Sequence, residues 1–133
     1  MTNKSSKILT EISPGELLDK ISILEIKLEK IQDKEKLKEI NKEYEILKKA
    51  QNLHINSNEK LNNLFMSIKK VNIKLWDVED KIRICEKNKE FNETFIKLAR
   101  DVYFFNDERA KIKLEINKTL KSNIREVKEY TDY

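Results

Sequence analysis

Residues 61–85 read LNNLFMSIKKVNIKLWDVEDKIRIC and place an apolar side chain at every third or fourth position. These positions are Leu61, Leu64, Ile68, Val71, Leu75, Val78, Ile82 and Cys85. This is the spacing of a helix that buries one stripe of its surface against other helices. A helix of about 30 residues is roughly 45 Å long, so this stretch predicts the longest element of the chain.

A second helix start stands out near the N-terminus, at Ser13-Pro14-Gly15-Glu16. Ser13 can cap the helix, Pro14 suits the first helical position, and Glu16 can reach back to the cap. The apolar residues that follow keep heptad spacing; they are Leu17, Ile21, Leu24, Leu28 and Ile31. We expect a helix from residue 14 to about residue 31.

Two further helices are predicted on either side of the long one. The earlier helix starts after a cap at Asp33 and carries Leu37, Ile40, Tyr44 and Leu47; residues 54–58 form a loop, with Ser57 or Asn58 as the next cap. The later helix follows a turn at Asn88-Lys89 and runs from Phe91 to Leu120 as one element, with room for a local irregularity at residues 106–107.

Composition excludes most other architectures. The chain has 133 residues with one Gly and one Pro, too few turn residues for a many-stranded sandwich or barrel and none of the glycine-rich loops of nucleotide folds. One Cys and one His exclude an internal disulfide and a histidine metal cluster. The predicted fold class is all-α: an antiparallel helical bundle, or coiled-coil hairpins, of about four helices.

We divide the chain into an N-terminal tail with a short extended piece (1–12), a helical domain (13–121) and a C-terminal tail (122–133). In this tail, Ile124, Val127 and Tyr130 are the expected docking points. The third and fourth helices are long enough to project past the first two, so exposed apolar positions there would need a partner, and a second copy of the chain is the simplest one.

The net charge of +4 comes from 28 basic and 24 acidic residues that are interspersed along the helices. Mixed charge is typical of a solvated face and not of a phosphate track, so a nucleic-acid partner ranks last. The sequence contains no run of 18 apolar residues, the length that would predict a membrane span. Residues 1–7 are polar, and no apolar stretch of signal-peptide length follows them. A cytoplasmic protein is the expectation.

The candidate site is a polar strip beside the apolar stripes. On the third helix, Trp76, Glu79 and Arg83 share one face with Asn72. On the fourth, Arg109 lies within the apolar stripe, with Tyr103 and Asn106 on its polar side. A charge there needs a partner, and Glu79, Asp80 and Glu25 are the expected carboxylates. The predicted ligand or partner surface is therefore Trp76, Glu79, Arg83, Tyr103, Asn106 and Arg109.

Each of these residues also has a purely structural interpretation. Glu79 and Arg83 are spaced as an i,i+4 ion pair, with Trp76 packed against a neighbouring helix. Arg109 fits a buried ion pair that fixes helix register, or alternatively an anion-binding group.

Catalytic and metal-binding residues are not predicted. Acids one turn apart occur at Glu16 and Asp19 and again at Asp77 and Asp80, the spacing with which all-helical nucleotide pyrophosphohydrolases hold Mg²⁺. Asp77 and Asp80, however, fall on the helix face opposite the apolar stripe. Such acid pairs are also frequent in a highly charged chain. Cys85 is expected as a small core residue. No cofactor is predicted.

Three motifs resemble a bacterial all-helical family catalogued as a domain of unknown function. They are ISPGELLDK (12–20), LWDVED (75–80) and VYFFNDERA (102–110). The resemblance keeps its order along nearly the whole chain and is weakest in the second helix. It implies a bacterial source, which suits the Lys, Ile and Asn bias, and it implies no activity, cofactor or catalytic residue.

These observations predict a non-enzymatic helical interaction module, a scaffold or adaptor, that associates with itself or with another protein. The alternative is a small helical enzyme or anion-binding protein. It would take a phosphate or carboxylate at Arg109 and Arg83, with Mg-dependent nucleotide hydrolysis as its enzymatic form.

Overall fold

The computed structural model describes residues 6–133 and contains four helices. They are α1 (Pro14–Lys30), α2 (Lys34–His54), α3 (Glu59–Asn88) and α4 (Glu93–Thr119). Residues 6–133 include no β-strand, so the all-α prediction is confirmed. Helix α4 is continuous through residues 106–107, and His54, expected in a loop, is the last residue of α2.

Side-chain caps start α1, α2 and α3 where the sequence predicts them. Helix α4 starts two residues later than expected, at Glu93, after a cap at Asn92. The Oγ atom of Ser13 accepts the backbone N–H of Glu16 at 3.2 Å, and Asp33 and Asn58 cap α2 and α3 in the same way. The left-handed backbone of Lys89, with φ of 55°, ends α3 at the expected turn. The contact of Glu16 differs from the prediction. Its carboxylate was expected to reach back to the cap residue Ser13, but it lies 2.7 Å from the Nζ atom of Lys113 on α4.

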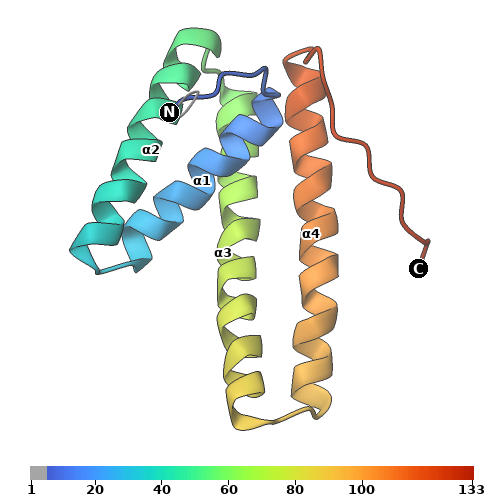
Figure 1. The fold of residues 1–133 in the computed structure, drawn as a ribbon. Helices are drawn as coiled ribbons and strands as arrows, with labels where there is room; N and C mark the ends of the chain where they lie inside the picture. The colour runs from blue at the N-terminus through green and yellow to red at the C-terminus, as the bar shows by residue number, and fades with distance from the viewer. Residues whose placement is uncertain (1–5) are drawn as a thin grey trace, which may run out of the picture.

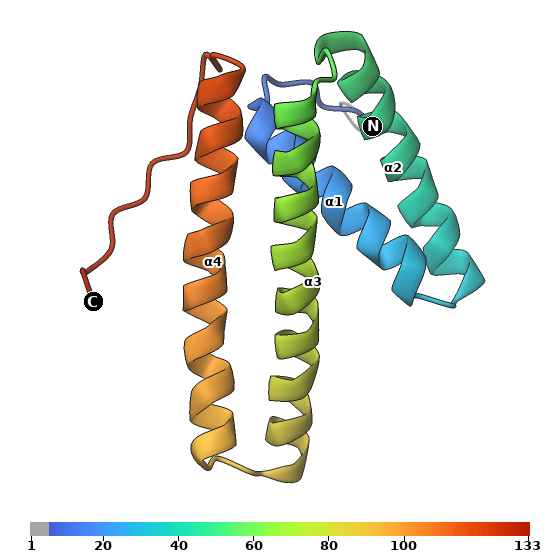
Figure 2. The ribbon, with the colours of Figure 1, turned by 180° about the vertical axis from the view of Figure 1, so that it is seen from behind.

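Helix α1 is the element that joins the others. Helices α3 and α4 form a long antiparallel hairpin, α1 crosses it obliquely near one end, and α2 lies alongside α1 (Figure 1). Helix α1 packs against all three other helices, whereas α2 packs mainly against α1. The opposite view shows the same two hairpins, α1–α2 and α3–α4 (Figure 2). The predicted antiparallel hairpins are confirmed, with α1 as their shared centre.

The apolar core lies where α1 meets the end of the α3–α4 hairpin. Its buried members come from three helices: Leu17, Leu18, Ile21, Leu61 and Ile116. Helix α2 contributes half-buried side chains such as Tyr44 and Leu47, and none of its residues is fully buried. The far half of α3 and α4 extends past α1 and α2 (Figure 1), which confirms the predicted projection.

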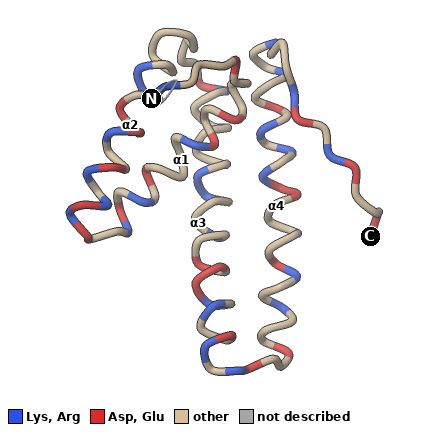
Figure 3. The backbone as a smooth tube through the Cα atoms, in the orientation of Figure 1, with Lys and Arg blue, Asp and Glu red and all other residues tan. Residues whose placement is uncertain are grey.

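Charged residues of both signs are interleaved along every helix (Figure 3). Such interleaving of opposite charges is typical of solvated helix surfaces and not of a track for a phosphate backbone. Within the described part of the chain, no helix combines the length and apolar character that a membrane span requires.

Candidate functional site

Five of the six predicted site residues line one cleft between α1, α3 and α4. The cleft has a volume of about 470 Å³. Its walls are Trp76, Glu79, Arg83, Asn106 and Arg109, together with Ile23, Ile26, Asn72, Leu75 and Asp80. The sixth residue, Tyr103, lies outside the cleft, on the surface of α4. There its ring meets Tyr133 at a centroid distance of 5.4 Å.

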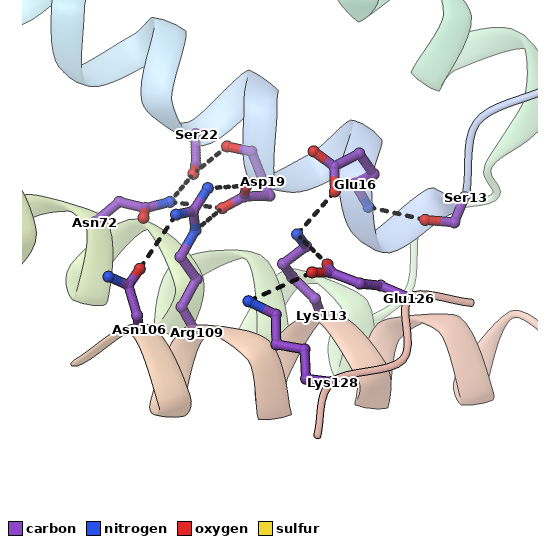
Figure 4. Close-up of polar contacts among 10 residues, drawn as sticks. All are labelled: Ser13, Glu16, Asp19, Ser22, Asn72, Asn106, Arg109, Lys113, Glu126 and Lys128. Carbon is purple, nitrogen blue, oxygen red and sulfur yellow. Dashed lines mark hydrogen bonds and ion pairs between the residues drawn. The ribbon is translucent and has the colours of Figure 1, made fainter. Parts of the chain in front are cut away.

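Arg109 forms an ion pair with Asp19 of α1. The Nε atom of Arg109 donates to Oδ1 of Asp19 at 2.9 Å, and Nη2 donates to Oδ2 at 2.5 Å (Figure 4). The side chain of Asp19 is fully buried and that of Arg109 is largely buried. This bidentate ion pair, with two parallel N–H···O hydrogen bonds, is a strong arrangement for a guanidinium and a carboxylate.

The expected partners of Arg109 were wrong. Because α1 crosses the hairpin obliquely, it meets α4 through its first turns, at Gly15, Glu16 and Asp19, and its last turns lie beside α2 (Figure 1). Glu25 is therefore out of reach of Arg109 and instead accepts from Lys69 Nζ at 3.1 Å and from the hydroxyl of Tyr44 at 3.1 Å. Glu79 pairs within its own helix with Arg83.

A second layer of hydrogen bonds surrounds the carboxylate of Asp19. The Nδ2 atom of Asn72 donates to Oδ1 of Asp19 at 2.9 Å and to Oγ of Ser22 at 2.8 Å. The hydroxyl of Ser22 in turn donates to the backbone carbonyl of Asp19 at 2.7 Å. The hydrogen bonds of Asp19 raise the pKa of Arg109; burial lowers it by less, and the negative charge of Asp19 adds to the increase.

Sequence reasoning missed the role of Asp19 and Ser22. Both lie among the buried positions of α1, next to Leu18 and Ile21, one helical turn apart. Two polar residues inside a wide apolar face signal a buried polar network, because such groups are buried only with partners. That signal was present in the sequence, but the position of the partner on α4 depends on the crossing of α1.

Glu79 and Arg83 form the predicted i,i+4 ion pair at the rim of the cleft. Both side chains are well exposed, so the pair contributes little to stability. With Arg109 matched by Asp19 and Arg83 matched by Glu79, Asp80 is the remaining charged residue of the lining. The cleft therefore carries no surplus positive charge.

The acid pairs do not converge on a common point. Glu16 pairs with Lys113 and Asp19 pairs with Arg109, so each carboxylate already has a cation. Asp77 and Asp80 are exposed. Across residues 6–133, no three His, Cys, Asp or Glu side chains are grouped as metal ligands. Cys85 is a buried free thiol, as predicted.

A separate ionic cluster holds the C-terminal segment (residues 120–133) against α4. The Nζ atom of Lys113 lies 2.7 Å from Glu16 and 3.0 Å from Glu126, and only 12% of its side chain is exposed (Figure 4). Lys128 also pairs with Glu126, at 3.3 Å. The pKa of Lys113 is raised overall. Burial is the largest single influence and lowers this pKa, but the hydrogen bonds to Glu16 and Glu126 and the negative charges of Asp19 and Glu16 together outweigh burial.

The docking points expected in the C-terminal segment were wrong. All three expected residues, Ile124, Val127 and Tyr130, are exposed. The segment is held instead by Glu126 and by the Tyr133 hydroxyl, which donates to Asp107. The ring of Tyr133 also packs edge-on against Phe104 at 5.2 Å.

The contact between Glu126 and Lys113 makes docking of this segment pH-dependent. The hydrogen bond from Lys113 lowers the pKa of Glu126, and the charges of Lys113 and Lys128 lower it further. A carboxylate with a lowered folded-state pKa contributes stability above its ordinary pKa, about 4.3, and loses it as the pH falls through the lower value. We expect segment 120–133 to detach in that acid range before the helices unfold.

Carboxyl carbon chemical shifts followed by NMR measure this titration directly. Lys113→Met should return the pKa of Glu126 towards its ordinary value, whereas Lys111→Met, at an exposed position of the same helix, should leave it lowered. An ordinary pKa for Glu126 in the wild-type protein would mean that the segment is not held by this pair.

Comparisons with known proteins assign the chain to a family and to no activity. Searches of curated proteins and of solved structures give no match. A family model matches residues 8–132, which includes all four helices and almost the entire C-terminal segment. The chain therefore belongs to the family of unknown function DUF6165.

Proposed function

We propose that this protein is a non-enzymatic interaction module, a scaffold or adaptor, that associates with a second copy of itself. The supporting observation is a groove on the α3–α4 hairpin, spanning residues 74–105 and about 780 Å³ in volume. None of its lining residues comes from α1 or α2. The groove is therefore left uncovered by the rest of the described chain.

The lining of this groove is suited to a copy of itself. Its floor is apolar, formed by Val78, Cys85, Leu98 and Phe105. Its rim carries three basic and three acidic residues: Lys74, Lys81, Lys97, Asp77, Glu93 and Asp101. A two-fold interface uses the same patch on both copies, so the patch must be self-complementary. Balanced charges around an apolar floor meet that condition.

An apolar side chain of the groove is more exposed than a solitary hairpin requires. Ile84, which lines the groove, is 49% exposed. Exposed apolar surface rimmed by charge is typical of a protein–protein interface. Two such hairpins packed side by side form a four-helix bundle with coiled-coil-like packing, in which Ile84 becomes buried.

An anion-binding or Mg-dependent function has less support. Arg109 donates two hydrogen bonds to Asp19, and Arg83 is paired with Glu79. Neither guanidinium has the unmatched charge that a phosphate site needs. A cytoplasmic setting goes with the proposed module, because its lone cysteine, Cys85, is a buried free thiol suited to a reducing compartment.

Ile84→Glu tests self-association. The substituted carboxylate would be desolvated at the interface between copies, whereas in the monomer it would remain in water. We expect wild-type protein at micromolar concentration to sediment as a dimer and Ile84→Glu to sediment as a monomer with unchanged helical circular dichroism.

The matched control is Ile46→Glu on α2, where the side chain is 61% exposed and far from the groove in sequence. This variant should dimerise as the wild type does. A wild-type protein that stays monomeric over the concentration range, or an Ile84→Glu variant that dimerises normally, would refute the proposed interface.

A further inference from the structure

The cleft holds a buried amide that lacks one of its hydrogen-bond partners. Asn72 is 5% exposed and lines the cleft. Its Nδ2 atom donates to Asp19 and to Ser22, yet within residues 6–133 no donor is assigned to its Oδ1 atom. This oxygen is open to the cleft, because among the described residues the side-chain polar atom that is both fully buried and without a partner is Oγ1 of Thr119. An added donor can therefore reach Oδ1 of Asn72.

Two neighbouring groups have spare donors. The Nη1 atom of Arg109 reaches Oδ1 of Asn106 at 3.4 Å, a long and weak contact. The Nδ2 atom of Asn106 has no acceptor assigned among the described residues. Figure 4 shows Asn72, Asn106 and Arg109 converging from α3 and α4. The base of the cleft therefore offers one acceptor and, beside it, amide and guanidinium donors.

The walls above this polar base are apolar and include an indole ring. The lining includes Ile23 and Ile26 of α1 and Leu75 and Trp76 of α3. Its volume of about 470 Å³ lies in the range of small-molecule pockets, which combine apolar walls with a few placed polar groups. A planar ring can stack on the face of an indole.

The charges of the lining decide against an anionic ligand. Arg109 and Arg83 are each paired with a carboxylate, and Asp80 adds a negative charge. A phosphate would meet no unmatched cation and would face Asp80. An uncharged ligand avoids this repulsion and can still use the donors and the acceptor at the base.

We propose that the cleft binds a planar, uncharged ring with adjacent hydrogen-bond donors and acceptors, the chemistry of a nucleobase, presented as a nucleoside. A ring N–H or exocyclic amine donates to Oδ1 of Asn72. A ring nitrogen or carbonyl accepts from Asn106 or Arg109. The ring lies against Trp76. This site is independent of the groove through which the copies associate, because the two share no lining residue.

The single tryptophan of the chain, Trp76, reports binding directly. Its fluorescence is excited at the red edge of indole absorption, where nucleosides do not absorb, and is titrated with adenosine, guanosine, cytidine and uridine. We expect saturable quenching by at least one of them. Asn106→Ala removes a donor at the base and should weaken that binding about tenfold or more.

Asn41→Ala is the matched control, an exposed asparagine on α2 outside the cleft. It should bind as the wild type does, and circular dichroism should show that both variants remain folded. Three results would overturn the proposal: no saturable quenching by any of the four nucleosides, unchanged binding by Asn106→Ala, or tenfold tighter binding of the nucleoside 5′-monophosphate than of the nucleoside. The last result would identify an anion site instead.

Discussion

Arg109→Ala should lower the free energy of unfolding by about 3–5 kcal/mol, the cost of breaking a buried ion pair by removing one partner. The substitution leaves the carboxylate of Asp19 fully buried between α1 and α4 without its counter-charge. Asn72 alone would still donate to its Oδ1 atom. Urea denaturation followed by circular dichroism measures the loss.

Two further variants isolate the cause. Arg100→Ala removes an exposed arginine from the same helix and should change stability by no more than about 0.5 kcal/mol. Asp19→Asn combined with Arg109→Met removes both charges while keeping an acceptor for Asn72, and should be more stable than Arg109→Ala alone. An Arg109→Ala protein as stable as the wild type would mean that Asp19 is compensated by other groups.

Gly15→Ala should destabilise the protein by about 1–3 kcal/mol, the usual range for overpacking, although alanine is the better helix former by about 0.5–1 kcal/mol. A Cβ atom at Gly15 would lie 2.5 Å from the backbone carbonyl oxygen of Lys113 and 2.8 Å from Oδ1 of Asn117. The backbone of α4 cannot yield as a flexible side chain can, so the first turn of α1 must move away. This also stretches the 2.7 Å hydrogen bond from Gly15 N–H to Asn117.

The role of the backbone contact can be separated from that of the amide. Asn117→Ala alone loses the acceptor of Gly15 N–H and should cost about 1–3 kcal/mol. Adding Gly15→Ala to it should cost still more, because the carbonyl of Lys113 remains in the way. Chemical denaturation of the three variants gives the double-mutant cycle. A Gly15→Ala protein more stable than the wild type would show that α1 does not approach α4 this closely.

The helices themselves could be predicted from local signals. Heptad spacing, the caps Ser13, Asp33 and Asn58 and the turn at Lys89 all act within a few residues, so the sequence displays them. The crossing of α1 could not be predicted in this way. It follows from the close approach allowed by Gly15 and from pairing of Asp19 with α4, contacts between residues about 90 to 100 positions apart.

The part of the candidate site that depends on local helical periodicity was predictable, and the part that depends on how the helices cross was not. Trp76, Glu79 and Arg83 share a face of α3 by helical periodicity alone, and Arg109 stood out as a charge in an apolar stripe. Identifying its partner required the angle between α1 and α4, which periodicity does not encode. Tyr103 was grouped with the site because it lies near Arg109 on α4, yet its ring turns to the surface and meets Tyr133.

Charge-reversal complementation tests most directly whether the groove joins two copies. One copy carries Lys74→Glu and Lys81→Glu, which makes its rim acidic; the other carries Asp77→Lys and Asp101→Lys, which makes its rim basic. Like rims repel and opposite rims attract. We predict that each variant sediments as a monomer alone and that the two form a heterodimer when mixed. Dimers formed by each variant alone, or no complex on mixing, would contradict self-association through the groove.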